Sequence, residues 1–164
     1  MRPDPNREMM RQVALQLGDL TEQLVFVGGV TAGLLITDPG APTVRPTQDV
    51  DVIAVIESHT DYYRLSELLR QRGFSEDRSE GAPMCRWISG GWQLDVMPTD
   101  ESILGFSNRW YALAASTAET MELDGDIKIK VITAPCFIAT KLEAFHGRGQ
   151  GDYLGSHDLE DIIA

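Results

Sequence analysis

Residues 24–29 read Leu-Val-Phe-Val-Gly-Gly and residues 49–56 read Asp-Val-Asp-Val-Ile-Ala-Val-Ile, and these two segments decide the fold. The first is a short apolar run typical of a buried strand, and it leads directly into a glycine pair. The segment 30–36 that follows suits a helix packed closely against that strand through small residues. We therefore expect a strand, a glycine turn and a helix, followed by a second strand over residues 50–56.

The second strand brings two carboxylates to one face. Side chains alternate between the two faces of a strand, so Asp49 and Asp51 point to the same side. A third acid, Asp95, stands later in the chain between Leu94 and Val96. An acid in an apolar strand is costly unless it is paired or bound to metal, so the three acids favour a cation. Mg²⁺ (or Mn²⁺) fits best, because it takes carboxylate oxygens and phosphates, and no His or Cys cluster suggests zinc.

The glycine pair adds a complementary feature. Gly28 and Gly29 permit close backbone approach at a helix N-terminus, where free N–H groups favour a phosphate, and Thr31 adds a hydroxyl. The plainer interpretation is a tight turn with close helix packing, and one turn can serve both purposes. A phosphate cradle beside paired aspartates points to nucleotides.

In this order, the three features resemble the DNA polymerase beta-like nucleotidyltransferase superfamily. The matching segments are Val27-Gly28-Gly29, Asp49-Val50-Asp51-Val52 and Leu94-Asp95-Val96. The resemblance implies an α/β (α+β) nucleotidyltransferase fold, with a mixed, mostly antiparallel β-sheet flanked by helices. It also implies an enzyme that uses Mg²⁺ to transfer NMP from an NTP to a hydroxyl acceptor.

A narrower resemblance is to the AbiEii/AbiGii-type nucleotidyltransferase toxin family. It rests on residues 45–51 (Arg-Pro-Thr-Gln-Asp-Val-Asp), residues 139–145 (Ala-Thr-Lys-Leu-Glu-Ala-Phe) with Arg148, and residues 158–162 (Asp-Leu-Glu-Asp-Ile). It implies RNA, and tRNA in particular, as the favoured acceptor, a toxin role in a toxin–antitoxin system, and an antitoxin protein as partner. A protein or a small molecule stays open as an alternative acceptor. Together the two resemblances cover most of residues 24–164.

The resemblance also implies a role for each candidate residue. Asp49 and Asp51 would hold the metals, and Asp95 would complete the metal site near the nucleophile or accept the proton of the attacking hydroxyl. Lys141 would neutralise the triphosphate or the departing pyrophosphate, and Arg45 is a lesser candidate for the same task. The plainer alternatives are surface carboxylates on edge strands and a solvated lysine on an amphipathic helix.

Two departures from the superfamily pattern concern the nucleotide entrance. Residues 30–48 separate Gly29 from Asp49, a longer gap than is usual, and the excess coincides with a loop over 38–43. Val30 stands where the superfamily often has Ser, so a hydroxyl contact to phosphate would come from Thr31 or be absent.

A second hypothesis, from another class, is a catalytically silent nucleotide-binding or regulatory module with the same fold. The three intact aspartates argue against it. Asp158 and Asp161 are expected mainly as structural partners of Lys141 or Arg148.

Glycine turns and helical periodicity predict the other elements. Two hairpins are expected, joining strands 85–88 with 92–97 and strands 119–123 with 127–132. Helices are expected over residues 7–22, from Ser58 to the Gly73 stop, over residues 133–146, and from Ser156 onward. We expect one domain over residues 1–164, and the last helix still runs at Ala164, which leaves open a longer natural chain.

Composition limits the class of protein. The 164 residues are 43% hydrophobic and 24% charged, which is typical of a globular domain with an ordinary core. A formal net charge of −11 opposes nonspecific adhesion to nucleic acid or anionic membrane, but is compatible with a local basic groove. Two separate cysteines, no membrane-length apolar run and a polar N-terminus favour a reduced, cytoplasmic protein.

Overall fold

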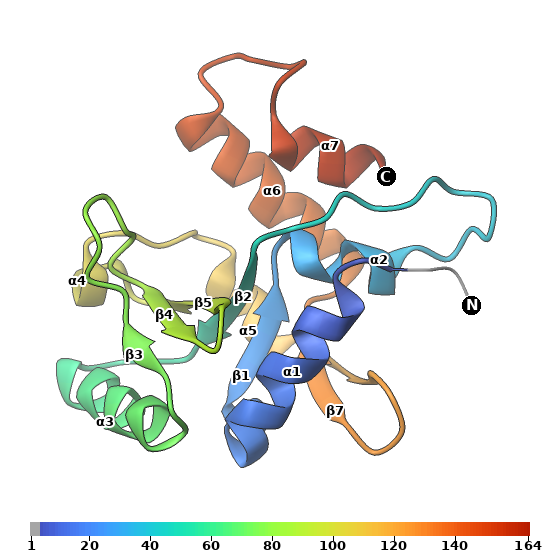
Figure 1. Cartoon of the computed structure of the whole chain (residues 1–164). Coiled ribbons are helices and arrows are strands. Elements are labelled where there is room, and N and C mark those ends of the chain that lie inside the picture. Colours follow the sequence, from blue (N-terminus) through green and yellow to red (C-terminus); the bar gives the residue numbers. More distant parts are fainter. Residues whose placement is uncertain (1–3) are drawn as a thin grey trace.

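The computed structural model describes residues 4–164, and a seven-stranded sheet forms its centre (Figure 1). The strand order across the sheet is β3-β4-β5-β2-β1-β7-β6. The strands are β1 (Leu24–Val27), β2 (Asp49–Ala54), β3 (Ser75–Glu76), β4 (Arg86–Ser89), β5 (Trp92–Pro98), β6 (Glu119–Glu122) and β7 (Lys128–Val131). Only the β1–β7 and β2–β5 pairings are parallel. The prediction of a mixed, mostly antiparallel sheet is therefore confirmed.

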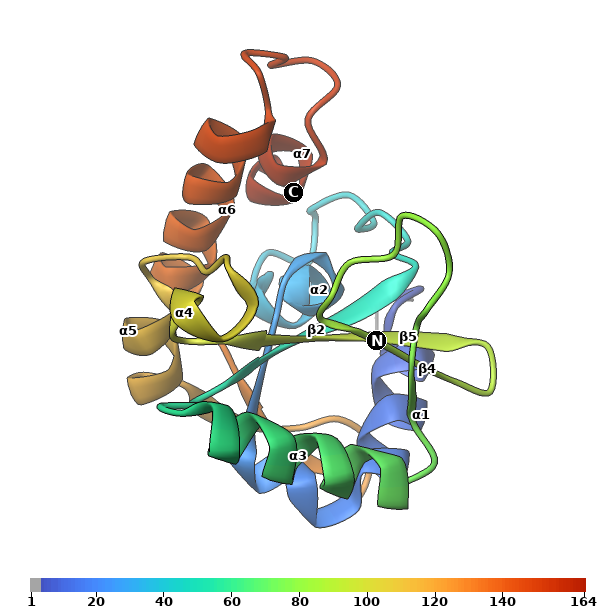
Figure 2. The same ribbon diagram turned by 90° about the vertical axis from the view of Figure 1, so that its left-hand side faces the viewer.

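Helices cover both faces of this sheet. The α-helices are α1 (Arg7–Leu17), α2 (Ala32–Leu35), α3 (His59–Gln71), α4 (Glu101–Leu104), α5 (Tyr111–Ser116), α6 (Ala134–Arg148) and α7 (His157–Ile163). Two 3₁₀ segments, η1 (Gly18–Gln23) and η2 (Gly29–Thr31), flank β1. Figure 2 shows α1 and α3 beneath the sheet, and α2, α6 and α7 above it.

A large part of the hydrophobic core lies between the sheet and the layer formed by α1 and α3. Val50 and Val52 of β2 are fully buried on this face, and Met10 and Leu17 of α1 are fully buried in the same core. Burying these apolar side chains drives the folding of the layer, because each fully buried one contributes about 1.5–3 kcal/mol. Alternation along β2 turns Asp49 and Asp51 to the opposite face, beneath α2, α6 and α7.

The two predicted hairpins form, within one residue of their expected ends. The glycine turn after β1 also forms, but the expected helix over 30–36 is divided between η2 and α2. The first helix ends earlier than residue 22 because Gly18 takes a φ of +58°, and the chain continues as η1. The sequence pattern does not indicate β3, α4 or α5, which have two to six residues each and are too short for a periodic signal.

Within residues 4–164, no helix combines the length and apolar character that crossing a membrane requires.

Candidate active site

Strand register brings the three predicted acids together. In the parallel β2–β5 pairing, Asp51 lies directly beside Asp95, and Asp49 precedes Asp51 on the same face of β2. The carboxylates of the three residues each offer an oxygen, and these atoms all lie within 4.8 Å of one another. Three hard oxygen donors this close together suit Mg²⁺ or Mn²⁺, so the side chains fit the cation that the sequence predicts.

Arg86 contacts two of these carboxylates. It stands opposite Asp95 in the antiparallel β4–β5 pairing. Its Nε and Nη2 donate to the two oxygens of Asp95, each at 2.8 Å, and Nη2 also donates to Oδ2 of Asp49 at 2.9 Å. The hydrogen bonds to Asp95 and the charges of both acids raise the pKa of the guanidinium, so Arg86 stays charged.

Asp51 is in a different situation from its two neighbours. Among residues 4–164 it has no ion pair and no hydrogen-bond partner for its carboxylate. Burial, together with the negative charges of Asp49 and Asp95, raises the pKa of Asp51 to about 7. A carboxylate in this state has a strong electrostatic preference for an added cation.

The predicted glycine turn lies directly against Asp51. Val27 pairs with Asp51 across the β1–β2 ladder, which places Gly28 beside the carboxylate. Gly28 has a φ of +73°, and a Cβ there would lie 2.0 Å from Oδ2 of Asp51. At Gly29, a Cβ would lie 2.8 Å from Oδ2 of Asp161. At Gly28, the positive φ and the nearby carboxylate together require glycine, whereas at Gly29 a side chain would crowd the carboxylate of Asp161.

The opposite side of the site is formed by α6 and α7. Lys141 of α6 is buried, and its Nζ donates to Asp161 at 2.6 Å and to Asp158 at 3.3 Å. Arg148 donates to both oxygens of Asp158, at 2.9 and 3.0 Å. Burial raises the pKa of Asp158, but the hydrogen bond from Arg148 and the charge of Lys141 outweigh it and hold that pKa below its usual value. The expected pairing of Asp158 and Asp161 with Lys141 or Arg148 is confirmed.

One cleft joins the two sides. It has a volume of about 900 Å³, and its lining includes all three clustered aspartates together with Arg45, Lys141 and Arg148. Arg86 lines it as well, so among residues 4–164 four basic side chains border this cavity. Five acidic residues share the same lining, so the cleft offers groups for both a cation and an anion.

The segment before Asp49 is held in place by Asn6. This buried side chain donates from Nδ2 to the carbonyl oxygen of Arg45 at 2.9 Å and accepts from the backbone N–H of Thr47 at 2.8 Å. Arg45 in turn lies 3.5 Å from the carboxylate of Asp161. These contacts fix Arg45 at the edge of the cleft.

Thr31 is placed differently from the other nucleotide-binding candidates. It is fully buried, and its hydroxyl donates to the carbonyl oxygen of Gly28 at 2.8 Å. The hydroxyl therefore closes the glycine turn from within and does not line the cleft. We leave Thr31 out of the proposed phosphate contacts.

Comparisons with known proteins address the fold. No protein-family model matches the sequence, and no curated protein matches it. Among solved structures, the chain is similar to an antigenic nucleotidyltransferase-like protein from Paracoccidioides brasiliensis, with a TM-score of 0.65 and 22% identity; the match covers 95% of this chain and 74% of that one. The chain has a nucleotidyltransferase-like fold. The predicted fold class is thereby confirmed, while the narrower AbiEii/AbiGii likeness stays a prediction.

Within the nucleotidyltransferase-like fold, Arg86 and Asn6 are the site residues that the sequence interpretation misses. A signal for Arg86 does exist, because a two-residue turn at Gly90-Gly91 sets a hairpin register in which residue 86 faces residue 95. Asn6 has no such signal, since its contacts join segments 39 and 41 residues apart.

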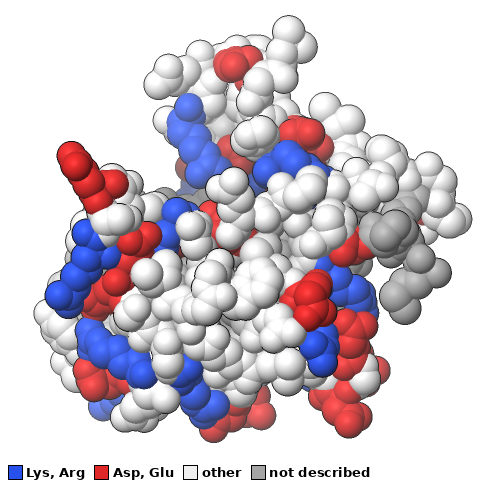
Figure 3. All heavy atoms as spheres, viewed as in Figure 1, with Lys and Arg blue, Asp and Glu red and all other residues white. Residues whose placement is uncertain are grey.

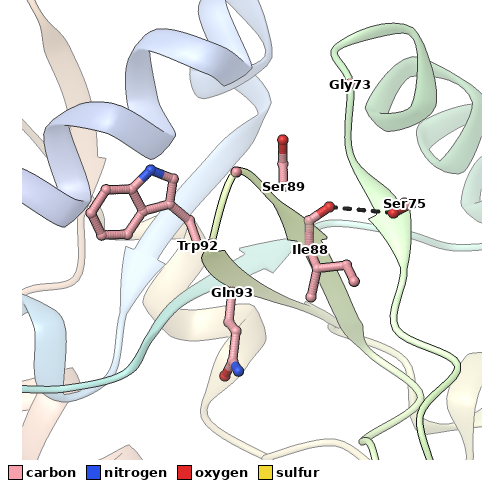
Figure 4. Close-up of a pocket in the computed structure, with 8 residues that line it drawn as sticks. Gly73, Ser75, Ile88, Ser89, Trp92 and Gln93 are labelled. Carbon is pink, nitrogen blue, oxygen red and sulfur yellow. Dashed lines mark hydrogen bonds between the residues drawn. The ribbon is translucent and has the colours of Figure 1, made fainter.

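A second cavity, of about 450 Å³, lies at the turn of the β4–β5 hairpin (Figure 4). It is bordered by Trp92, Gln93 and Ile88, and Ser75 donates to the carbonyl oxygen of Ile88 at 3.5 Å. Among residues 4–164, no charged side chain lines it, so this part of the chain supplies no ionic group there to hold a metal or a phosphate.

Proposed function

We propose that this protein transfers a nucleoside monophosphate from an NTP to a hydroxyl group, with Mg²⁺ (or Mn²⁺) held by Asp49, Asp51 and Asp95. The observation that supports this function is the opposition, within one cleft, of three clustered carboxylates and the cations Lys141 and Arg148. A nucleotide bound with a metal carries both the cation and the anion that such a cleft attracts.

Each side chain has a task in this proposal. Lys141 and Arg148 would neutralise the phosphates, and Arg45 would meet them at the entrance. Gly28 and Gly29 would offer their backbone to the phosphates, although the carboxylates of Asp51 and Asp161 already lie where a Cβ of each glycine would point. The bound cation would supply charge that stabilises the phosphate oxygens during displacement.

The chemical step is an in-line displacement. The hydroxyl oxygen of the acceptor forms a bond to the α-phosphorus of the NTP, and the bond from that phosphorus to the pyrophosphate oxygen breaks. Pyrophosphate leaves with the electron pair. The proton of the hydroxyl passes to the carboxylate of Asp95 or to water, and Asp95 can accept it only when Arg86 no longer occupies its oxygens.

For the acceptor we propose RNA, with tRNA as the first substrate to test. The segment Arg45–Asp51 and the Lys141 helix, on which the AbiEii/AbiGii likeness rests, both border the cleft. A role as the toxin of a toxin–antitoxin system, with an antitoxin as partner, belongs to the same proposal. Acidic and basic side chains are interspersed on the face shown in Figure 3, and they form no continuous basic surface there. An RNA would therefore bind at the cleft and not along that face.

A second candidate is a nucleotide-binding or regulatory module without turnover. The observation that favours it is the guanidinium of Arg86 on Asp49 and Asp95. If this contact persists when nucleotide binds, the site cannot collect a divalent cation.

One experiment separates the two candidates. Isothermal titration with each of the four NTPs, with and without Mg²⁺, is followed by incubation with labelled NTP and total tRNA. Magnesium-dependent binding with label on the RNA supports the transferase. If NTP binds but tRNA stays unlabelled, the incubation is repeated with protein and small-molecule hydroxyl acceptors, and binding without label on any of them supports the silent module. The absence of NTP binding in both conditions contradicts both candidates.

A further inference from the structure

Arg86 occupies the oxygens that the proposed metal requires. Its three hydrogen bonds go to both oxygens of Asp95 and to one oxygen of Asp49, and only 19% of its side chain is exposed. Asp51 receives none of these bonds. The two carboxylates on either side of Asp51 are therefore already neutralised in part by a cation belonging to the chain itself.

A guanidinium and a divalent cation cannot share these oxygens at low cost. Arginine does not lose its charge in proteins, so Arg86 cannot become neutral to make room for a metal. Like charges at the same carboxylates oppose one another, particularly where burial reduces solvent screening. Metal binding at the site then requires Arg86 to give up at least part of its contact with Asp49 and Asp95.

The cleft offers a destination for the displaced side chain. Arg86 borders the same cavity as Lys141 and Arg148, so its guanidinium remains among the groups that face an incoming anion. Phosphate oxygens are the strongest partners for a guanidinium, since they accept two parallel hydrogen bonds as a carboxylate does. Arg86 can exchange the two aspartates for the phosphates of a nucleotide.

We propose that Arg86 couples metal binding to nucleotide binding: it opposes the metal when no nucleotide is present and binds the phosphates once the metal takes its place. This inference rests on the proposed function and adds the order of assembly. Metal alone should bind weakly, and metal with NTP should bind strongly.

A purely structural role for Arg86 leads to the opposite expectation. If the guanidinium only keeps the carboxylates together, its removal should spread them apart and weaken metal binding. If it competes with the metal, its removal should strengthen the binding of metal alone. The sign of the change in metal affinity therefore distinguishes the two roles.

The experiment titrates the whole chain with Mn²⁺ alone and follows free Mn²⁺ by electron paramagnetic resonance. We expect Arg86→Gln to bind Mn²⁺ about tenfold more tightly than the wild type, because one opposing charge is gone. Calorimetry at saturating Mn²⁺ should show about tenfold weaker NTP binding in the same variant, because a bidentate phosphate contact is lost. Equal or weaker Mn²⁺ binding in Arg86→Gln would overturn the inference.

Arg86→Lys serves as the second variant if Arg86→Gln does not fold. It keeps the charge but loses the planar two-pronged contact with Asp95, so its affinity for Mn²⁺ alone should lie above that of the wild type. Wild-type affinity or lower in Arg86→Lys would then contradict the coupling.

The matched control is Arg7→Gln. Arg7 is also a partly exposed arginine bonded to a carboxylate, that of Asp124 at 3.1 Å, and it does not border the cleft. Its replacement should leave Mn²⁺ affinity unchanged. Asp51→Asn tests the metal site separately from the role of Arg86. If Asp51→Asn abolishes Mn²⁺ binding but Arg86→Gln does not bind Mn²⁺ more tightly than the wild type, the metal site stands and only the inference about Arg86 is contradicted. A wild type and variants that all fail to bind Mn²⁺ sink the metal site and the inference together.

Discussion

The side of the cleft formed by the sheet (the sheet side) places the carboxylates of Asp49, Asp51 and Asp95 near one guanidinium, that of Arg86. The side formed by α6 and α7 (the helical side) places two buried carboxylates near three cations. The carboxylates are those of Asp158 and Asp161, and the cations are Lys141, Arg148 and Arg45. The same kind of side chain therefore meets opposite conditions a short distance apart. Asp51 has a pKa raised to about 7 by burial and by like charges, while Arg148 and Lys141 hold the pKa of Asp158 below its usual value.

This difference in charge pairing means that the ion pairs of the helical side stabilise the fold, whereas the carboxylate of Asp51 on the sheet side, which its acidic neighbours repel, destabilises it. On the helical side the ion pairs satisfy one another and hold α7 against α6, so removing one partner should destabilise the protein. On the sheet side Asp51 is repelled by Asp49 and Asp95 and has no cation partner among residues 4–164, so removing its charge should favour the folded state. Removing Asp95 would instead leave the guanidinium of Arg86 without its main partner. A site that is retained against its cost in stability is typical of function.

The largest expected effect comes from breaking the sheet side at Asp51. Asp51→Asn should lower nucleotidyl transfer by about 10³-fold or more if the proposed metal site is correct, because losing a metal ligand costs several kcal/mol in the transition state. The free energy of unfolding should not fall, and the loss of repulsion with Asp49 and Asp95 favours a rise. Labelled-NTP transfer and thermal unfolding, both without added metal and with it, measure the two quantities.

The control for this variant is Asp126→Asn, which removes an exposed carboxylate from the β6–β7 turn and should change neither quantity. Retained transfer in Asp51→Asn would remove Asp51 from the metal site. A loss of folding would show that the sheet acids are structural and would erase the contrast between the two sides.

The second largest effect comes from breaking the helical side at Lys141. Lys141→Met should lower the free energy of unfolding by about 3 kcal/mol, because Asp161 and Asp158 lose a buried partner. Transfer should fall by about 10²-fold through the loss of the phosphate contact proposed for Lys141. Chemical denaturation and the transfer assay measure the two effects. The control is Lys128→Met, which removes a lysine from an exposed ion pair with Glu122 at 3.9 Å and should change the free energy of unfolding by less than about 0.5 kcal/mol.

These two variants should change stability in opposite directions, although both remove charge from one cleft. If Lys141→Met is as stable as the wild type, the helical ion pairs do not hold α7, and the contrast is lost.

The sequence predicts the sheet side of this comparison better than the helical side. Period-two alternation places Asp49 and Asp51 on one face, and apolar neighbours mark Asp95 as a strand residue, so local pattern suffices there. The parallel pairing that sets Asp51 beside Asp95 joins residues 44 positions apart, and only the family resemblance points to it.

Residues whose role depends on tertiary contacts lie beyond local pattern. Asn6 looks like an ordinary turn residue until the loop before Asp49 folds over it. Thr31 has the right side chain for a phosphate contact, but the 3₁₀ turn directs its hydroxyl to Gly28. Short elements such as β3 and α4 are missed because two to four residues carry no periodicity.

A smaller effect should follow from filling the space beside Asp51. Gly28→Ala places a Cβ 2.0 Å from the carboxylate and adds about 1–3 kcal/mol of strain at a φ of +73°. Because Asp51 must shift, we also expect about tenfold weaker Mn²⁺ binding, as for a disturbed ligand shell. Gly105→Ala is the matched control, since its φ of +82° is also positive but a Cβ there would meet nothing within 4 Å.

Both glycine variants should therefore lose stability, and only Gly28→Ala should lose metal affinity. Equal Mn²⁺ affinities in the two would mean that Asp51 is not a ligand or that it moves without consequence.

The smallest effect is the dependence of metal binding on pH. Because the pKa of Asp51 is raised to about 7, a proton and a metal compete for its carboxylate below that pH. Mn²⁺ affinity should weaken several-fold from pH 7 to pH 6, approaching about tenfold per unit below that, and the same electron paramagnetic resonance titration measures it. An affinity that does not change between pH 7 and pH 6 would contradict this competition.

The same raised pKa should make the stability of the metal-free protein depend on pH. The unfolded chain releases the Asp51 proton near pH 3.8, whereas the folded protein keeps it up to about pH 7. The folded state binds more protons in that window, so the stability of the wild type relative to Asp51→Asn should fall as pH rises from about 4 to about 7. Thermal unfolding of both proteins across this range measures the difference, and a difference that stays flat or rises would mean that the positive charges of the helical side already reach Asp51 and compensate it.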